Sequence, residues 1–158
     1  MPVSNSITLR FLAEPTDVNF GGKVHGGSVM KWIDQAGYAC ATHWSGSYCV
    51  TVYVGGIRFL KPILIGSLVE VQAKVIYTGR TSMHIGVDVW ASDPKDDEMT
   101  KTTSCIIIFV AMDKEGVPKQ APNWVPETEE DKELEKHAIR LMELRTAIQD
   151  EMDKVISK

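Results

Sequence analysis

The residues most able to do chemistry lie between Asn19 and Asp34, where a glycine-rich segment runs into an apolar stretch. Asp34 falls about two turns into a predicted helix, too far from its start to be a capping residue. Burying a carboxylate is costly unless the group is paired or its pKa rises, so a chain that keeps one in a buried helix generally uses it. We therefore expect Asp34 to be a catalytic base or nucleophile, with a structural carboxylate bonded to loop amides as the alternative.

The start of the same helix could stabilise negative charge. At His25-Gly26-Gly27, unpaired backbone N–H groups and the positive end of the helix dipole could hold an oxyanion, so we select Gly26 and Gly27 as catalytic candidates. An ordinary flexible helix entry is the alternative, and for His25 a structural or lining role is favoured over that of a base. Asn19 could orient water or a carbonyl, or could simply be a turn residue.

The middle of the chain is locally basic. Between residues 51 and 85 a single acid, Glu70, accompanies four bases, which are Arg58, Lys61, Lys74 and Arg80. Arg80-Thr81-Ser82 adds hydroxyl and backbone donors in a turn, and the set suits an anionic ligand that carries phosphates. Solvated charges on strand faces are an equally good explanation.

Hydrophobic periodicity predicts the elements that position these residues. Period-2 alternation and turn signals indicate strands at 4–12, 48–60, 68–78, 83–89 and 102–112, with a bulge at Gly55-Gly56. Helical spacing indicates helices at about 27–44 and 127–156. The first helix is rich in residues with small side chains and is predicted to be buried. Asp34 lies on the same side of this helix as Met30, Gly37 and Ala41.

The strand patterns also predict facing and order. In 68–78, alternate residues from Val69 to Tyr77 face the core, and the residues between them, such as Glu70 and Lys74, face water. The most apolar strand, 102–112, should be central. The fold class is therefore α+β, a five-stranded antiparallel sheet around one long helix plus a C-terminal helix. We divide the chain into a domain at 1–126 and a helix at 127–158 that packs on that domain or at an oligomer interface. Open sheet edges favour at least a dimer.

Composition limits the function classes. The 158 residues, 44% hydrophobic with a net charge of -4, favour one globular domain and a small-molecule partner over nucleic acid. Three cysteines without CxxC spacing suggest reduced cytoplasmic thiols, and we expect no targeting or membrane segment. The serine-hydrolase elbow, the P-loop and metal-ligand spacings are missing from the sequence.

Three ordered motifs give the sequence a family resemblance. They are the stretch from Asn19 to Asp34, Phe59-Leu60-Lys61-Pro62-Ile63 and Thr78-Gly79-Arg80-Thr81-Ser82. Over residues 5–113 the chain resembles the hotdog-fold acyl-CoA thioesterases of the bacterial YciA and mammalian cytosolic acyl-CoA hydrolase type. The joint occurrence of the motifs is far more specific than any one of them.

The resemblance implies hydrolysis of fatty or short-chain acyl-CoA to free acid and coenzyme A, without a required cofactor. It implies dimers with a continuous ten-stranded sheet, commonly assembled as a trimer of dimers, with sites between subunits. Asp34 would be the base or nucleophile, Asn19 would act across the dimer, and amides near Gly26 and Gly27 would polarise the thioester. Coenzyme A, as part of the substrate, would lie along Arg80, Thr81 and Ser82, and less surely Lys61 and Arg58. The alternatives are a hotdog enoyl-CoA hydratase or dehydratase, which would use His25, and a non-catalytic acyl-CoA-binding module.

Overall fold

The structure is a computed structural model that describes residues 3–156, with five strands and three helical segments. The strands are β1 (Ser6–Leu12), β2 (Cys49–Phe59), β3 (Leu68–Thr78), β4 (Ser82–Ser92) and β5 (Thr100–Ala111), and the helical segments are the 3-10 turn η1 (Pro15–Asp17), α1 (Gly26–Ser45) and α2 (Glu129–Ile156). All five strands pair antiparallel in one sheet of order β1-β3-β4-β5-β2. The predicted α+β class is confirmed.

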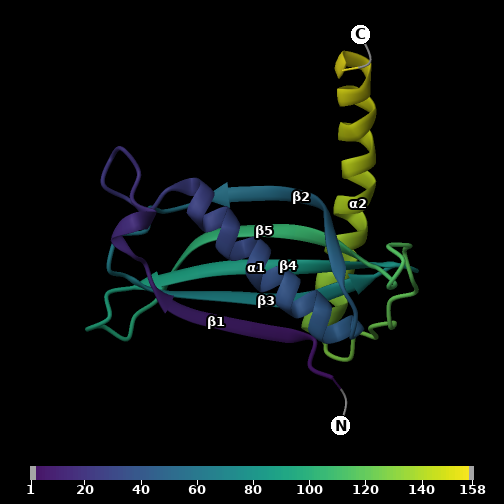
Figure 1. Cartoon of the computed structure of the whole chain (residues 1–158), viewed down its shortest axis with the longest axis horizontal. Helices are drawn as coiled ribbons and strands as arrows, with labels where there is room; N and C mark the ends of the chain where they lie inside the picture. Colours follow the sequence, from purple (N-terminus) through teal and green to yellow (C-terminus); the bar gives the residue numbers. More distant parts are fainter. Residues whose placement is uncertain (1–2, 157–158) are drawn as a thin grey trace.

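Helix α1 lies diagonally across one face of the sheet and forms the core with it (Figure 1). Its small residues allow the close approach that the sequence predicted. At Gly37 a Cβ atom would come within 2.8 Å of the Phe109 ring and 3.0 Å of the Ile107 side chain, both fully buried on β5. The helix therefore sits too close to β5 at this point to admit even an alanine without displacement.

Two expectations about the strands need correction. The middle strand is β4, whereas β5 is an interior strand between β4 and β2. In β3 the register with β4 shifts between Val75 and Tyr77. This bulge turns Tyr77 away from the core, and its ring packs edge-on against His84 with 4.9 Å between centroids.

The second face of β3, predicted to be wet, is covered in part, although Gln72 on it is exposed. Glu70 is only 7% exposed and accepts a hydrogen bond from Arg10 Nε at 2.9 Å. Lys74 Nζ lies 2.6 Å from Asp131 Oδ1, at the first turn of α2. Helix α2 therefore crosses the face opposite α1, and strand-face charges that the sequence left solvated are paired.

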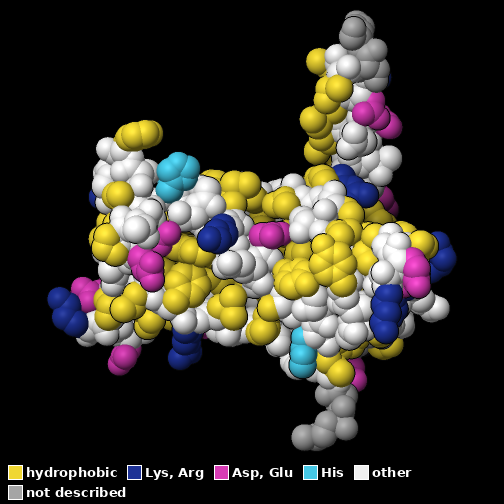
Figure 2. All heavy atoms as spheres, viewed as in Figure 1, with side chains coloured by type: hydrophobic (Ala, Val, Ile, Leu, Met, Phe, Trp, Pro, Cys, Tyr) yellow, Lys and Arg dark blue, Asp and Glu magenta, His cyan; other side chains and the backbone are white. Residues whose placement is uncertain are grey.

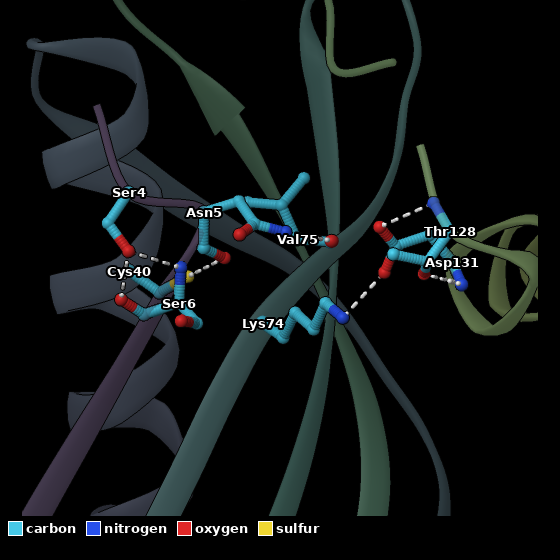
Figure 3. A network of polar contacts seen from close by, with 8 residues as sticks. All are labelled: Ser4, Asn5, Ser6, Cys40, Lys74, Val75, Thr128 and Asp131. Atoms are coloured by element: carbon cyan, nitrogen blue, oxygen red, sulfur yellow. Dashed lines mark hydrogen bonds and ion pairs between the residues drawn. The ribbon is translucent and has the colours of Figure 1, made fainter. Parts of the chain in front are cut away.

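Figure 3 shows how four elements are joined around this ion pair. The Asn5 side-chain amide donates to the Val75 carbonyl at 3.4 Å, and the Cys40 thiol of α1 donates to the Asn5 carbonyl at 3.5 Å. At the start of α2, Thr128 Oγ1 accepts from the Asp131 N–H at 3.0 Å, which caps the helix. The start of α2 is thus fixed to β3, while β1 is tied to both β3 and α1.

The far part of α2 leaves the body of the molecule. Figure 1 shows it passing behind the sheet and projecting beyond β2. Of its 28 residues, Ala138 is buried. Within residues 3–156 no helix combines the length and the apolar character needed to cross a bilayer.

Candidate active site

A hydrogen bond between α1 and β2 defines the centre of the site. Thr51 Oγ1 donates to Asp34 Oδ1 at 2.8 Å. Thr51 was not among the residues selected from the sequence. One signal could have found it: alternation along the strand places Thr51 on the same face as the buried Cys49, and that face looks toward α1.

Asp34 is exposed in the single chain, and the expectation that it is buried is wrong. The residues of the helical stripe on which Asp34 lies differ in their burial. Gly37 and Ala41 face the sheet, while Met30 at the other end of the stripe is 46% exposed. Helix α1 crosses the sheet diagonally (Figure 1), and in its N-terminal half the stripe is exposed, at Met30 and Asp34. The cost of burying a carboxylate therefore does not apply to the isolated chain.

The surroundings of Asp34 are nevertheless apolar. Met30 and Tyr38 lie one turn before and after it on α1, and Val52 follows Thr51 on β2; these three side chains are 39–52% exposed. The Tyr38 ring packs edge-on against Tyr48, with 6.3 Å between centroids. Figure 2 shows several hydrophobic patches on this face of the molecule, with a basic and an acidic side chain near its centre. Such a patch is typical of a surface that another molecule covers.

At the start of α1 the two glycine amides differ. His25 is the N-cap residue, and its Nδ1 accepts the Gly27 N–H at 2.8 Å. The Gly26 N–H makes no hydrogen bond to any group in residues 3–156. Gly26 therefore offers a free donor at the positive end of the helix, whereas the Gly27 donor is engaged by the histidine. The structural role favoured for His25 is observed.

Asn19 organises the loop before α1. Its Oδ1 accepts from the N–H groups of Gly21 at 2.8 Å and Lys23 at 3.0 Å. The backbone of Asn19 also pairs with that of Lys23 at 2.6 Å. Its side-chain NH₂ has no partner within residues 3–156, so the turn role and a role as a donor to a ligand are compatible.

Gly26 and Asp34 of one chain cannot act on the same atom. They are eight residues apart on a straight helix, which separates them by about 12 Å at ~1.5 Å per residue. A reacting carbonyl must lie ~3 Å from each of its partners. One chain therefore presents two half sites: a donor half at Asn19 and Gly26, and a carboxylate half at Asp34 and Thr51.

The residues selected for an anionic ligand occupy separate places. Arg80 and Thr81 lie in the β3–β4 turn, and Ser82 begins β4. The turn is held by two hydrogen bonds: the Ala121 N–H donates to the Arg80 carbonyl at 2.9 Å, and the N–H of Ala111, at the end of β5, donates to the Thr81 carbonyl at 3.0 Å. Lys61 lies in the connection after β2, and Arg58 lines a cleft between β2 and α2 on the opposite face. The chain by itself does not bring these five side chains together.

Other ionisable groups are buried away from this site. Burial raises the pKa of the Cys40 and Cys105 thiols to about 12, and burial also raises that of Cys49. Burial, with the nearby Arg145 charge, lowers the pKa of His84 to about 4. In the described chain no three His, Cys, Asp or Glu side chains are grouped as metal ligands would be.

Comparison with known proteins gives consistent matches. A family model for the thioesterase superfamily matches residues 21–98. The chain is 34% identical over 140 residues to protein VdlD of Helicobacter pylori, covering 89% of this chain and 80% of VdlD. It is 36% identical over 120 residues to the acyl-CoA thioester hydrolase YciA of Escherichia coli, covering 73% of this chain and 90% of YciA.

Solved structures match over nearly the whole chain. An acyl-CoA hydrolase from Staphylococcus aureus, in complex with butyryl coenzyme A, coenzyme A and coenzyme A disulfide, superposes with a TM-score of 0.89 at 28% identity and covers 98% of this chain and 94% of its own. Structures of that enzyme also exist with one asparagine, one aspartate or one threonine replaced by alanine. An apo-hexameric acyl-CoA thioesterase matches with a TM-score of 0.89 at 32% identity, covering 94% of this chain and 96% of its own. The chain therefore belongs to the thioesterase superfamily, among the hotdog-fold acyl-CoA thioesterases of the YciA type.

Proposed function

We propose that this protein hydrolyses acyl-CoA thioesters to a free acid and coenzyme A. The observation that carries the proposal is the Asp34–Thr51 pair on an open apolar face. In the Staphylococcus aureus enzyme the substituted asparagine stands fifteen residues before the aspartate, and the threonine seventeen after it. Asn19 and Thr51 stand at the same distances from Asp34. The two proteins thus share a polar triad with one spacing.

In the mechanism, Asp34 removes a proton from water as the water attacks the thioester carbonyl, or it attacks directly to give an anhydride that water then opens. The free Gly26 amide stabilises the tetrahedral oxyanion, and Gly27 joins it where His25 releases the Gly27 N–H. Collapse breaks the carbon–sulfur bond and releases the coenzyme A thiolate. In the base route the thiolate takes the proton that Asp34 removed from water; in the anhydride route the proton comes from the water that opens the anhydride. Thr51 holds the carboxylate in place and Asn19 aligns the carbonyl or the water.

A complete site needs two copies of the chain. Because Gly26 and Asp34 are about 12 Å apart along one helix, Asn19 and Gly26 of one copy serve Asp34 and Thr51 of the other. The hexameric relative supports self-association, and a trimer of dimers is the arrangement we propose. We also propose that Arg80, Thr81 and Ser82, with Lys61 and Arg58, contact coenzyme A, as the family resemblance implies.

We further propose a cytoplasmic location, supported by three buried thiols that are not joined in disulfides. No separate cofactor and no nucleic-acid partner are part of the proposal. The hydratase alternative is weakened because Nδ1 of His25 is engaged by Gly27 and Asp34 is bonded to Thr51.

The test measures thiol release from a panel of acyl-CoAs. We expect the wild type to release coenzyme A and Asp34→Asn to lose at least ~10²-fold in kcat/KM, since general base catalysis contributes about that much. Asp150→Asn, an exposed aspartate on α2, is the matched control and should be unaffected. Full activity of Asp34→Asn would remove Asp34 from the mechanism. Absorbance change with an enoyl-CoA and no thiol release would replace hydrolysis by hydration.

A further inference from the structure

Helix α2 carries an apolar seam with the period of a coiled coil. Its positions alternate by four and three residues along the helix, and they are Leu134, Ala138, Leu141, Arg145, Ile148, Met152 and Val155. Six of the seven are apolar, and the guanidinium of the seventh, Arg145, lies over the Tyr53 ring of β2. A repeat of this kind keeps one stripe of a helix facing another helix over several turns. We call these seven residues the α2 seam.

The seam is covered only at its beginning. Ala138 is 1% exposed against the sheet, whereas Leu141 and Ile148 are 46% and 56% exposed, and Met152 and Val155 are 50% and 75% exposed. The middle of the seam forms one wall of a cleft of about 450 Å³ whose other wall is β2, β4 and β5. A stripe of this length exposed to water is a surface that another molecule covers.

The position of α2 indicates which molecule that is. The Arg145 guanidinium lies 4.8 Å from the ring centroid of Tyr53, so α2 crosses β2 near the middle of that strand. From Arg145 to Ile156 the helix runs about 16 Å further at ~1.5 Å per residue. That length spans about three strand spacings of ~4.8 Å. Figure 1 shows this part of α2 beyond the β2 edge of the sheet.

The edge beneath it is open. Among the described residues β2 pairs with β5 on one side and with nothing on the other, and Val52 and Val54 are exposed on it. An uncovered apolar edge strand is a template for another strand. If a second copy extends the sheet through β2, its own strands lie directly under the projecting half of α2.

We propose that the α2 seam packs antiparallel against the α2 seam of a second copy, across a two-fold axis near Tyr53. A two-fold interface requires one surface that is complementary to itself, and a heptad stripe centred on the crossing point meets that requirement. The hexameric relative covers 94% of this chain, so the match extends into α2. The helix carries nine acids against five lysines and arginines, which disfavours an anionic lipid surface as the occupant.

Neighbouring substitutions in the middle of α2 test the surface. Ile148→Asp places a charge in the seam, and Ala147→Asp places the same charge on the solvent side of the helix. Alanine has a higher helix propensity than isoleucine, so Ala147→Asp should destabilise the helix more than Ile148→Asp does. A specific effect of Ile148→Asp on assembly therefore cannot be due to weaker helix formation. By sedimentation velocity, Ile148→Asp should raise the dissociation constant of the assembly more than about tenfold, while Ala147→Asp leaves it unchanged. Unchanged assembly of Ile148→Asp, or a monomeric wild type, would overturn the proposal.

Cysteine cross-linking tests the antiparallel arrangement. In an antiparallel pair, residues near the crossing point meet their own copies and residues at the helix end do not. Leu144→Cys, beside Arg145, should form disulfide-linked dimers on mild oxidation, and Val155→Cys should not. The native thiols are buried and should not interfere. Efficient linking of Val155→Cys would show parallel helices and contradict the proposal. Sedimentation and cross-linking do not depend on turnover, so they test the α2 interface independently of the proposed thioesterase activity.

Discussion

At the scale of single residues, the Thr51 hydroxyl is the group that fixes the Asp34 carboxylate. It bonds one carboxylate oxygen at 2.8 Å, and the second oxygen has no hydrogen bond from residues 3–156. A carboxylate anchored from one side keeps its orientation when the other oxygen takes a proton. Asp34 could be selected from its position in a helix, although the burial expected there is not observed. Strand alternation could place Thr51 on the face toward α1, but it could not pair Thr51 with Asp34, because the two residues lie on different elements.

Removal of this hydroxyl should reduce turnover without unfolding the chain. Hydrogen bonds to charged groups contribute about 1.5–3 kcal/mol, so Thr51→Val should lower kcat by roughly 10- to 100-fold. Thr51→Ser keeps the donor and should recover most of the activity. Steady-state thiol release gives the comparison, and wild-type kcat in Thr51→Val would show that the bond has no part in the reaction.

His84 makes stability depend on pH. Burial lowers its pKa to about 4 in the folded chain, against an ordinary value of 6.5. Between these values the unfolded chain binds a proton that the folded chain does not, so the free energy of unfolding falls as pH falls, by about 2 kcal/mol from pH 7 to pH 5. Urea unfolding at the two pH values should show this loss in the wild type and in His43→Gln, an exposed control. The loss should be much smaller in His84→Gln; an equal loss there would assign it to other groups.

At the scale of elements, the strand and helix segments could be predicted from hydrophobic periodicity and turn residues. The side of the sheet toward which the last residues of β3 point could not be predicted in this way. One extra residue between Val75 and Tyr77 reverses the facing of everything after it, and no residue type announces the insertion. The exposure of Asp34 was missed for a related reason. Helical period gives the stripe on which a residue lies, but the crossing angle of α1 decides which end of the stripe is buried.

The contact between α1 and β5 predicts the effect of a small change. In a free helix Gly→Ala is stabilising by about 1 kcal/mol, but at Gly37 the new methyl group meets the Phe109 ring at 2.8 Å. Because Phe109 and Ile107 are fully buried, neither can move aside easily. We expect Gly37→Ala to lower the free energy of unfolding by roughly 1–3 kcal/mol. Urea unfolding measures this, and a stabilised variant would show that the helix can shift outward freely.

At the scale of the whole molecule, the two half sites and the open β2 edge lead to one requirement. Asp34 and Thr51 lie beside β2, and the donor half at Gly26 lies about 12 Å away along α1. The proposed mechanism therefore requires association through this region, which would also cover apolar surface. The resemblance implied this requirement; composition and periodicity could show only that sheet edges were open.

A charge on the edge should separate the copies and stop turnover together. Val54→Lys places a cation on the outer edge strand, where two copies would bring like charges close. We expect a species that sediments more slowly, and a loss of thiol release in proportion to the loss of assembled protein. Val117→Lys changes another exposed valine, in the loop after β5, and should alter neither the sedimenting species nor thiol release. Full activity in a monomeric Val54→Lys would show that one chain suffices.

The projecting half of α2 has a further consequence for hydrogen exchange. Its last eleven residues, 146–156, are all exposed in the single chain. An isolated helical segment shorter than ~12–15 residues is only marginally stable in water. The amide protons of this segment should therefore exchange with deuterium rapidly in a separated chain and slowly once a neighbouring chain packs against it. Their protection factors should then measure the fraction of chains that are assembled.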